Sequence, residues 1–190
     1  MIKWEPSACI LGALLILTLP LKWLMAAAIA ASFHELCHVL AIRLCGGRIW
    51  EVKIDMGGAR METEPLTPGR ELVCALAGPG GSLLLLLFCR YIPRIALCAG
   101  VHALFNLLPI YPMDGGRALR CGAGLILPKR KAEILCTWIQ RGVLLGLLLL
   151  GIQCSIVLQL GIFPVLMSGL LVIKSLSRKI PCKDGKVGVQ

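Results

Sequence analysis

The residues best suited to chemistry are two histidines and a glutamate within one apolar stretch of the sequence. His34 and His38 lie four positions apart, and Glu35 directly follows His34. Side chains four positions apart share one face of a helix, so the two imidazoles could bind one metal ion. Zinc held by three protein groups keeps a position for water and lowers the pKa of that water. The pattern therefore predicts a zinc site in which Glu35 serves as the general base.

A chance match is the alternative for so short a motif, with the three side chains only packing or pairing. The run from Met25 to Phe33 that precedes the motif is almost entirely apolar. In a bilayer, an ionisable side chain at the centre of a helix costs roughly 2.5–3.5 kcal/mol. A cost of this size favours a functional role, and we interpret the motif as a metal site.

The third ligand is either the remaining histidine, His102, or a carboxylate. Asp114 stands at the end of a later apolar run, in a stretch that also holds Pro109, Pro112 and two glycines. Irregular backbone at membrane depth is tolerated where it lines a cavity, so Asp114 could face the two histidines. A helix-capping or turn role is the alternative for Asp114. His102 is either a hydrogen-bonded histidine inside the bundle or a ligand or proton-handling group.

The composition indicates that the bilayer is the solvent of this chain. Hydrophobic residues make up 57% of the 190 residues and charged residues 16%, against roughly 25% charged residues in a soluble domain. The mean hydropathy is +0.83. A helix needs about 20 mostly apolar residues to cross the membrane. We therefore expect an all-α membrane protein with about six transmembrane helices, at Ser7–Leu21 (short, and re-entrant as an alternative), Trp23–Leu44, Leu72–Cys89, Ile95–Ile110, Ile134–Gly151 and Ser155–Ile173.

The net charge of +10 is interpreted as a topology signal and not as a nucleic-acid surface, because the cations lie at the ends of hydrophobic runs. If the N-terminus is cytoplasmic and all six segments cross, Lys22, Arg90 and Arg94 lie outside and nearly every other Lys and Arg lies inside. This bias places both polar loops, Arg43–Arg70 and Arg117–Lys131, and both termini in the cytoplasm. We expect a multi-pass protein of the cell membrane with its active site toward the cytoplasmic side.

A cleaved signal peptide is the alternative for the start of the chain, with small residues at Ala26–Ala31 as the cleavage region. That stretch lies inside the second hydrophobic run, so we expect Met1 to be retained.

The ten cysteines include no Cys-x-x-Cys pair and lie mostly in apolar segments. We expect them to stay reduced, without a disulfide framework or a thiolate zinc site.

The segment Arg48–Glu64 has the pattern of a small β-hairpin. Apolar residues alternate with charged ones from Trp50 to Met56, and Gly57-Gly58 supplies a turn. Alternation of this kind predicts a strand with one apolar face, so we expect a hairpin near residues 48–64 at the membrane surface. A surface loop with chance alternation is the alternative.

The small residues from Leu76 to Ser82 indicate that another helix packs closely against this stretch. A second interpretation is that they leave room beside the active site.

The two motifs together resemble the site-2 protease family of intramembrane zinc metalloproteases. H-E-x-x-H is followed by N-L-L-P-x-x-P-x-D-G-G, which runs from Asn106 to Gly116. The resemblance covers roughly Ser7 to Ile173, and the small size and six-span plan most resemble the branch of the stage IV sporulation protein FB. It implies that His34, His38 and Asp114 are zinc ligands, that Glu35 is the catalytic base, and that Asn106 and Pro109 shape the substrate side of the cleft.

The same branch is similar in having a surface hairpin near its active centre. A protease must hold its substrate backbone extended, and a strand edge can pair with such a segment. We therefore predict that Val52 and Ile54 help to bind the substrate. The sporulation branch commonly continues into a nucleotide-sensing CBS domain, whereas this sequence ends at Gln190. We expect a six-span domain at 1–173 with its core at 23–120, a short cytoplasmic tail at 174–190, and no CBS domain.

The resemblance implies hydrolysis of a peptide bond in a membrane-associated precursor, with an inactive sigma-type transcription factor as the implied substrate in sporulation. We expect Zn2+ as cofactor, the substrate and the lipid bilayer as partners, and no nucleic acid. An inhibitory membrane partner and the oligomeric state are left open. One alternative is a metal-binding membrane protein without protease activity, either a transporter or an inactive relative. Another is a structural or assembly factor. Glu35 favours the enzyme, because a transport site does not require a glutamate at that position.

Overall fold

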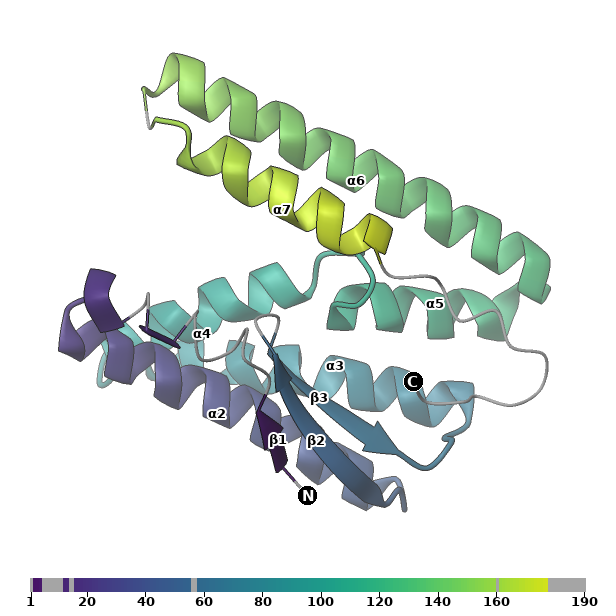
Figure 1. Cartoon of the computed structure of the whole chain (residues 1–190). Coiled ribbons are helices and arrows are strands. Elements are labelled where there is room, and N and C mark those ends of the chain that lie inside the picture. The colour runs from purple at the N-terminus through teal and green to yellow at the C-terminus, as the bar shows by residue number, and fades with distance from the viewer. Residues whose placement is uncertain (1, 5–11, 14–15, 56–57, 160, 178–190) are drawn as a thin grey trace. The chain divides into compact units, whose positions relative to one another are not determined.

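The structure is a computed structural model that describes residues 2–4, 12–13, 16–55, 58–159 and 161–177 (Figure 1). The chain forms two compact units, Met1–Asn106 and Leu107–Lys186. The first unit contains β1 (Ile2–Trp4), α2 (Leu21–Leu44), β2 (Ile49–Asp55), β3 (Gly58–Thr63), α3 (Pro68–Leu84), the 3-10 helix η1 (Leu85–Phe88) and α4 (Pro93–Asn106). The second contains α5 (Asp114–Ile126), α6 (Lys129–Val157) and α7 (Phe163–Ser177).

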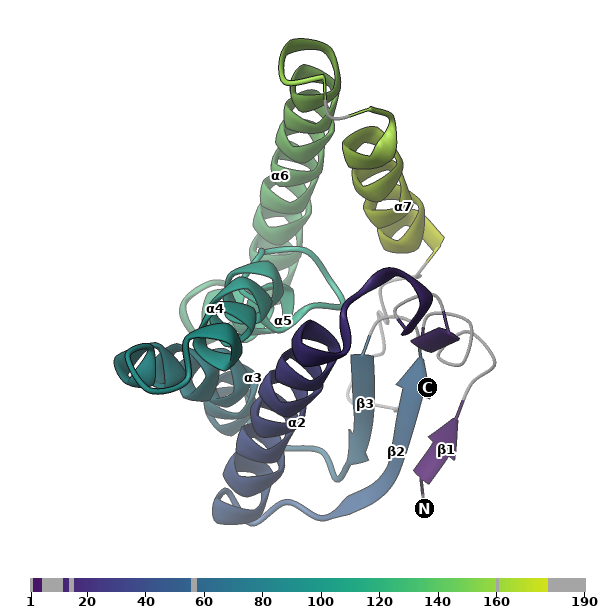
Figure 2. The same ribbon diagram turned by 90° about the vertical axis from the view of Figure 1, so that its left-hand side faces the viewer.

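Small side chains let the helices of the first unit approach closely. Helix α2 packs against α3 and α4, and α3 packs against α4 (Figure 2). Most of their buried hydrophobic residues are alanines, among them Ala26, Ala30, Ala75, Ala96, Ala99 and Ala103. In a bilayer, where apolar burial does not drive helices together, small residues allow the close packing that holds them. Large side chains such as Leu36, Val73 and Leu104 are exposed instead, as expected of lipid-facing surfaces.

The strands of the first unit form one sheet in the order β1, β2, β3 (Figure 1). Strand β1 pairs in parallel with β2, and β2 pairs in antiparallel with β3, with Val52 opposite both Ile2 and Met61. Strands β2 and β3 occupy the position of the predicted hairpin, although part of its predicted Gly57-Gly58 turn lies outside the described residues. Among the described strands, β2 is paired on both sides, and β1 and β3 are the edges of the sheet.

The second unit differs from the prediction in two places. In this unit, α5 packs against α6, and α6 against α7. The interpretation of Arg117–Lys131 as a polar loop was wrong, because most of it lies in α5, an amphipathic helix. The predicted boundary between Gly151 and Ser155 was also wrong, because α6 continues to Val157. The chain turns later, at Gln159 and Gly161, which both have positive φ.

Three of the described helical segments are long and apolar enough to cross a membrane: Leu21–Leu44, Pro68–Phe88 and Lys129–Val157. They overlap the predicted second, third and fifth spans. Helices α4 and α7 have 14 and 15 residues, fewer than the approximately 20 residues that a full crossing needs. The first predicted span, Ser7–Leu21, lies largely outside the described residues. The total of six spans therefore stays a prediction.

Candidate metal centre

The imidazoles of His34 and His38 lie next to each other on the buried side of α2. Their exposed fractions are 1% and 7%, and their Nε2 atoms are 3.1 Å apart. The ring planes are nearly perpendicular, with centroids 4.8 Å apart. The spacing of four residues on one helix produces this arrangement, as predicted. Each ring therefore presents one nitrogen to a common point.

The second nitrogen of each imidazole is held by helix α3. His38 donates a hydrogen bond from Nδ1 to the backbone carbonyl of Cys74, at 2.7 Å. The Nδ1 atom of His34 is hydrogen-bonded to the hydroxyl of Ser82, at 3.0 Å. Such outer contacts orient metal-binding histidines and set which nitrogen is offered to the ion. The sequence indicated packing for the stretch that includes Ser82, and the contact with His34 was not predicted.

Two glycines allow α3 to come this close to α2. A β-carbon at Gly78 would collide with Nε2 of His38, and a β-carbon at Gly81 would collide with Sγ of Cys37. Gly80, on another side of the same helix, has nothing within 4 Å of a β-carbon built on it. The glycines on the side that faces α2 therefore make room for the histidine rings. This finding supports the prediction that the small-residue stretch packs closely.

Asp114 is the first residue of α5 and is buried, with 9% exposure. The capping position is taken by Met113, and no side chain caps the helix there. The guanidinium of Arg117, three residues further on, lies 4.0 Å from the Asp114 carboxylate. The backbone before the helix is tightly folded, since a β-carbon at Gly115 would meet the carbonyl of Leu107. An aspartate in the first turn also suits the positive end of the helix dipole.

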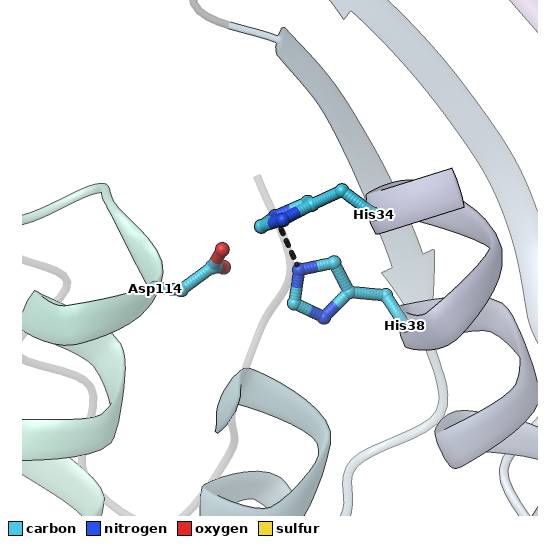
Figure 3. A group of neighbouring side chains, drawn as sticks. All are labelled: His34, His38 and Asp114. Atoms are coloured by element: carbon cyan, nitrogen blue, oxygen red, sulfur yellow. Dashed lines mark hydrogen bonds between the residues drawn. The ribbon is translucent and has the colours of Figure 1, made fainter. Parts of the chain in front are cut away.

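His34, His38 and Asp114 form the one group of three potential metal ligands among the residues that the structure describes. One ligand atom from each lies within 4.8 Å of the other two (Figure 3). Bonds of roughly 2.0–2.1 Å around a tetrahedral zinc separate two nitrogens by about 3.3 Å, close to the 3.1 Å between the two Nε2 atoms. Two imidazoles and one carboxylate are a donor set of catalytic zinc sites. The residues therefore fit zinc.

His102 lies beside this group without belonging to it. Its ring meets the ring of His34 edge to face, with centroids 4.6 Å apart. Its backbone carbonyl accepts a hydrogen bond from the side-chain amide of Asn106, at 3.0 Å. Asp114, and not His102, is among the three residues that could hold a metal ion, and its role as the third ligand stays a prediction. His102 instead supports the His34 ring by aromatic contact.

The other predicted site residues are spread over several elements. Glu35 lies on α2 and is half-buried, Asn106 is the last residue of α4, and Pro109 is half-buried in the segment before α5. Val52 and Ile54 lie in the central strand β2. The catalytic and substrate-binding roles assigned to these five residues stay predictions.

The fold is similar to that of a solved site-2 protease from Methanocaldococcus jannaschii. The TM-score is 0.66, and the alignment covers 96% of this chain and 93% of that chain. The two sequences are 21% identical over this alignment. No protein-family model and no curated protein matches this sequence. The chain thus has a site-2 protease fold, with membrane-spanning candidates and a buried histidine-histidine-aspartate group.

Proposed function

We propose that this chain is an intramembrane zinc metalloprotease that hydrolyses a peptide bond of a membrane-associated protein. The observation that carries the proposal is the paired imidazoles of His34 and His38, whose Nε2 atoms lie 3.1 Å apart while both Nδ1 atoms are engaged by α3. The grouping of these rings with the Asp114 carboxylate and the similarity to the site-2 protease fold support it.

In this proposal, His34, His38 and Asp114 hold the ion. When bound, zinc lowers the pKa of a coordinated water and polarises the carbonyl to be cleaved. Glu35 accepts the proton of the attacking water and delivers it to the leaving amine. Its place directly after His34 on α2 keeps it near the ligands without making it one. A serine or cysteine nucleophile is not needed for this reaction.

The sheet is proposed to hold the substrate in an extended form. Because β2 is paired on both sides, an incoming segment would pair with an edge of the sheet, and we favour β3. Backbone hydrogen bonds at such an edge give affinity with little dependence on sequence. Val52 and Ile54 would then act by maintaining the central strand that supports this edge. Asn106 and Pro109 would shape the substrate side of the cleft.

The proposal includes the wider setting implied by the sequence. We propose a multi-pass protein with six spans and its active centre toward the cytoplasmic side, as the distribution of Lys and Arg favours. The substrate class is a membrane-tethered precursor, with an inactive sigma-type factor as the specific candidate. Glu35 favours an enzyme over a transporter, since binding a transported ion does not need a general base.

The test is cleavage of candidate membrane-tethered precursors co-expressed with the chain. Wild type should yield a shortened product, and Glu35→Gln should yield none while still binding zinc. Glu133→Gln is a matched control, because Glu133 is exposed on α6. Cleavage by Glu35→Gln at the wild-type rate would contradict the mechanism. A wild-type protein that binds zinc but cleaves none of the precursors would favour the transporter or the inactive relative.

A further inference from the structure

Helix α6 is longer than a membrane crossing requires. Its 29 residues form a helix about 43 Å long, at about 1.5 Å per residue, against a hydrocarbon core of roughly 30 Å. About nine residues therefore extend beyond the core. The charged residues of α6 lie toward its N-terminal end, and none follows Arg141 within the helix. The extension is therefore at the start of α6, over residues 129–137.

Trp138 and Arg141 support this position of the membrane surface. Trp138 is 67% exposed, and tryptophan is enriched where the hydrocarbon core meets the lipid headgroups. The guanidinium carbon of Arg141 lies 6.0 Å from the centre of the Trp138 ring. A long arginine side chain can extend from just inside the core to the interface. The residues of α6 before Trp138 thus lie at the level of the headgroups.

The extension begins with three exposed cations, Lys129, Arg130 and Lys131. Among the residues that the structure describes, no ion pair joins them to an acidic side chain, and this includes Glu133 on the same helix. The cations do not stabilise α6, because positive charge near a helix N-terminus opposes the helix dipole. Their charge is therefore available to an anionic partner.

Exposed apolar side chains lie next to these cations in the sequence. Helix α5 packs against α6 and ends at Ile126 (Figure 1). Leu125 and Ile126 are 55% and 84% exposed, and two residues separate Ile126 from Lys129. Exposed apolar residues beside lysines and arginines are typical of a segment that lies in the membrane interface. Residues 125–131 are called the basic corner below.

We propose that the basic corner binds the phosphate groups of anionic lipids in the leaflet that it faces, and so holds the start of α6 at the membrane surface. The inference rests on the membrane placement in the proposed function and does not depend on the proposed zinc chemistry. Lys and Arg donate charge-assisted hydrogen bonds to phosphate oxygens. Leu125 and Ile126 add contact with acyl chains, which a free phosphate ion cannot offer.

The first experiment measures lipid binding to the purified full chain in detergent by native mass spectrometry. Phosphatidylglycerol should bind more tightly than phosphatidylcholine, which has no net charge, and inorganic phosphate should not displace it. Lys129→Gln/Lys131→Gln should weaken phosphatidylglycerol binding about 25-fold, from about 5-fold for each cation. Lys129→Arg/Lys131→Arg keeps both charges and should bind like wild type. Displacement of the lipid by inorganic phosphate would indicate a site for free anions and would overturn the proposal.

Arg90→Gln/Arg94→Gln is the matched control for the loss of charge. Both arginines are exposed, and they lie just before and near the start of α4 in the first unit. This variant loses the same charge as Lys129→Gln/Lys131→Gln, so its tightest phosphatidylglycerol binding should equal that of wild type. An equal loss in the two double variants would indicate a general attraction to a positively charged chain and would contradict a site at the basic corner.

The second experiment uses the wild-type chain and so does not depend on the folding of a variant. The chain is reconstituted in vesicles of phosphatidylcholine and phosphatidylglycerol, with a photoreactive group on the phosphatidylglycerol headgroup. After illumination, peptides from the basic corner should be the most strongly labelled part of the chain. Labelling confined to other segments would overturn the proposal.

Zinc content and precursor cleavage separate this inference from the proposed function. If cleavage depends on Glu35 but phosphatidylglycerol binding is the same in wild type and in Lys129→Gln/Lys131→Gln, the basic corner is wrong and the proposed function stands. If wild type neither holds zinc nor cleaves a precursor, yet binds phosphatidylglycerol through these cations, the proposed function is wrong and the lipid site stands.

Discussion

The Nε2 atom of His38 occupies the space that a β-carbon on Gly78 would fill. Any side chain at this position must displace either the histidine ring or helix α3. Gly78→Ala should therefore disrupt the metal centre, with zinc affinity about 10- to 100-fold weaker, as for loss of an orienting contact. Chelator competition on the purified protein measures this effect.

Gly80→Ala is the control for Gly78→Ala on the same helix. A β-carbon at Gly80 meets nothing within 4 Å, and alanine favours a helix by up to about 1 kcal/mol over glycine. Zinc affinity should equal that of wild type, and thermal stability should be equal or higher. Equal zinc affinity in Gly78→Ala and wild type would show that α3 does not pack on His38 as described.

The backbone before α5 should be equally sensitive to added volume. A β-carbon at Gly115 would collide with the carbonyl of Leu107, whereas one at Gly122 meets nothing within 4 Å. Because backbone cannot move as a side chain can, Gly115→Ala should shift the neighbouring Asp114. We expect loss of both zinc binding and precursor cleavage in Gly115→Ala and neither in Gly122→Ala. The zinc content and the yield of cleaved product are measured for both variants. Equal values in Gly115→Ala and Gly122→Ala would contradict the prediction.

The side chain of Gln140 connects three segments of the second unit. Its amide oxygen accepts a hydrogen bond from the backbone N–H of Tyr111 at 3.2 Å, and its amide nitrogen donates to the Ser175 hydroxyl at 2.6 Å. Gln140→Leu leaves two polar groups without this partner, each at a cost of about 1–3 kcal/mol. We expect a lower unfolding temperature and reduced cleavage, since Tyr111 precedes Asp114 by three residues.

Gln153→Leu is the matched control on the same helix, because Gln153 is exposed. Exposed substitutions usually change stability by no more than about 0.5 kcal/mol. Thermal unfolding of the two variants in one detergent gives the comparison. An unfolding temperature for Gln140→Leu that equals that of Gln153→Leu would mean that the amide bridge does not stabilise the second unit.

The sheet should matter most for substrates that must be unwound. Proline at position 52 cannot donate to the ladder of the central strand β2, so Val52→Pro should weaken the sheet. Cleavage of a precursor with a helical cleavage segment should fall, while cleavage of a short unstructured peptide should be retained. Val52→Thr keeps the β-branched shape and the backbone N–H and should behave like wild type. An equal loss with both substrates would instead indicate general damage to the fold.

The sequence predicted the features that depend on local spacing. The four-residue spacing of His34 and His38 determines that they share a helix face, and the alternation from Trp50 to Met56 has the period of the strand that the structure contains. Both signals are local, so no knowledge of distant contacts was required.

Features that depend on distant contacts were not predicted. Ser82 lies 48 residues from His34 in sequence, and a serine after glycines has the same local appearance whether it packs or binds. The charges of Arg117–Lys131 were interpreted as those of a polar loop between two spans, yet most of this segment lies in the amphipathic helix α5, which packs against α6. Likewise the fifth span was predicted to end at Gly151, but α6 continues to Val157, and Gly151 leaves room for Ser168 and Pro164 of α7 to approach.

The zinc content of the purified chain shows whether His34, His38 and Asp114 hold a metal ion. We expect about one zinc per chain in wild type and in Glu35→Gln, and loss of this zinc in His34→Ala, His38→Ala and Asp114→Asn. Full zinc content in Asp114→Asn, or a wild-type protein that binds no zinc, would contradict a centre built from two histidines and one aspartate.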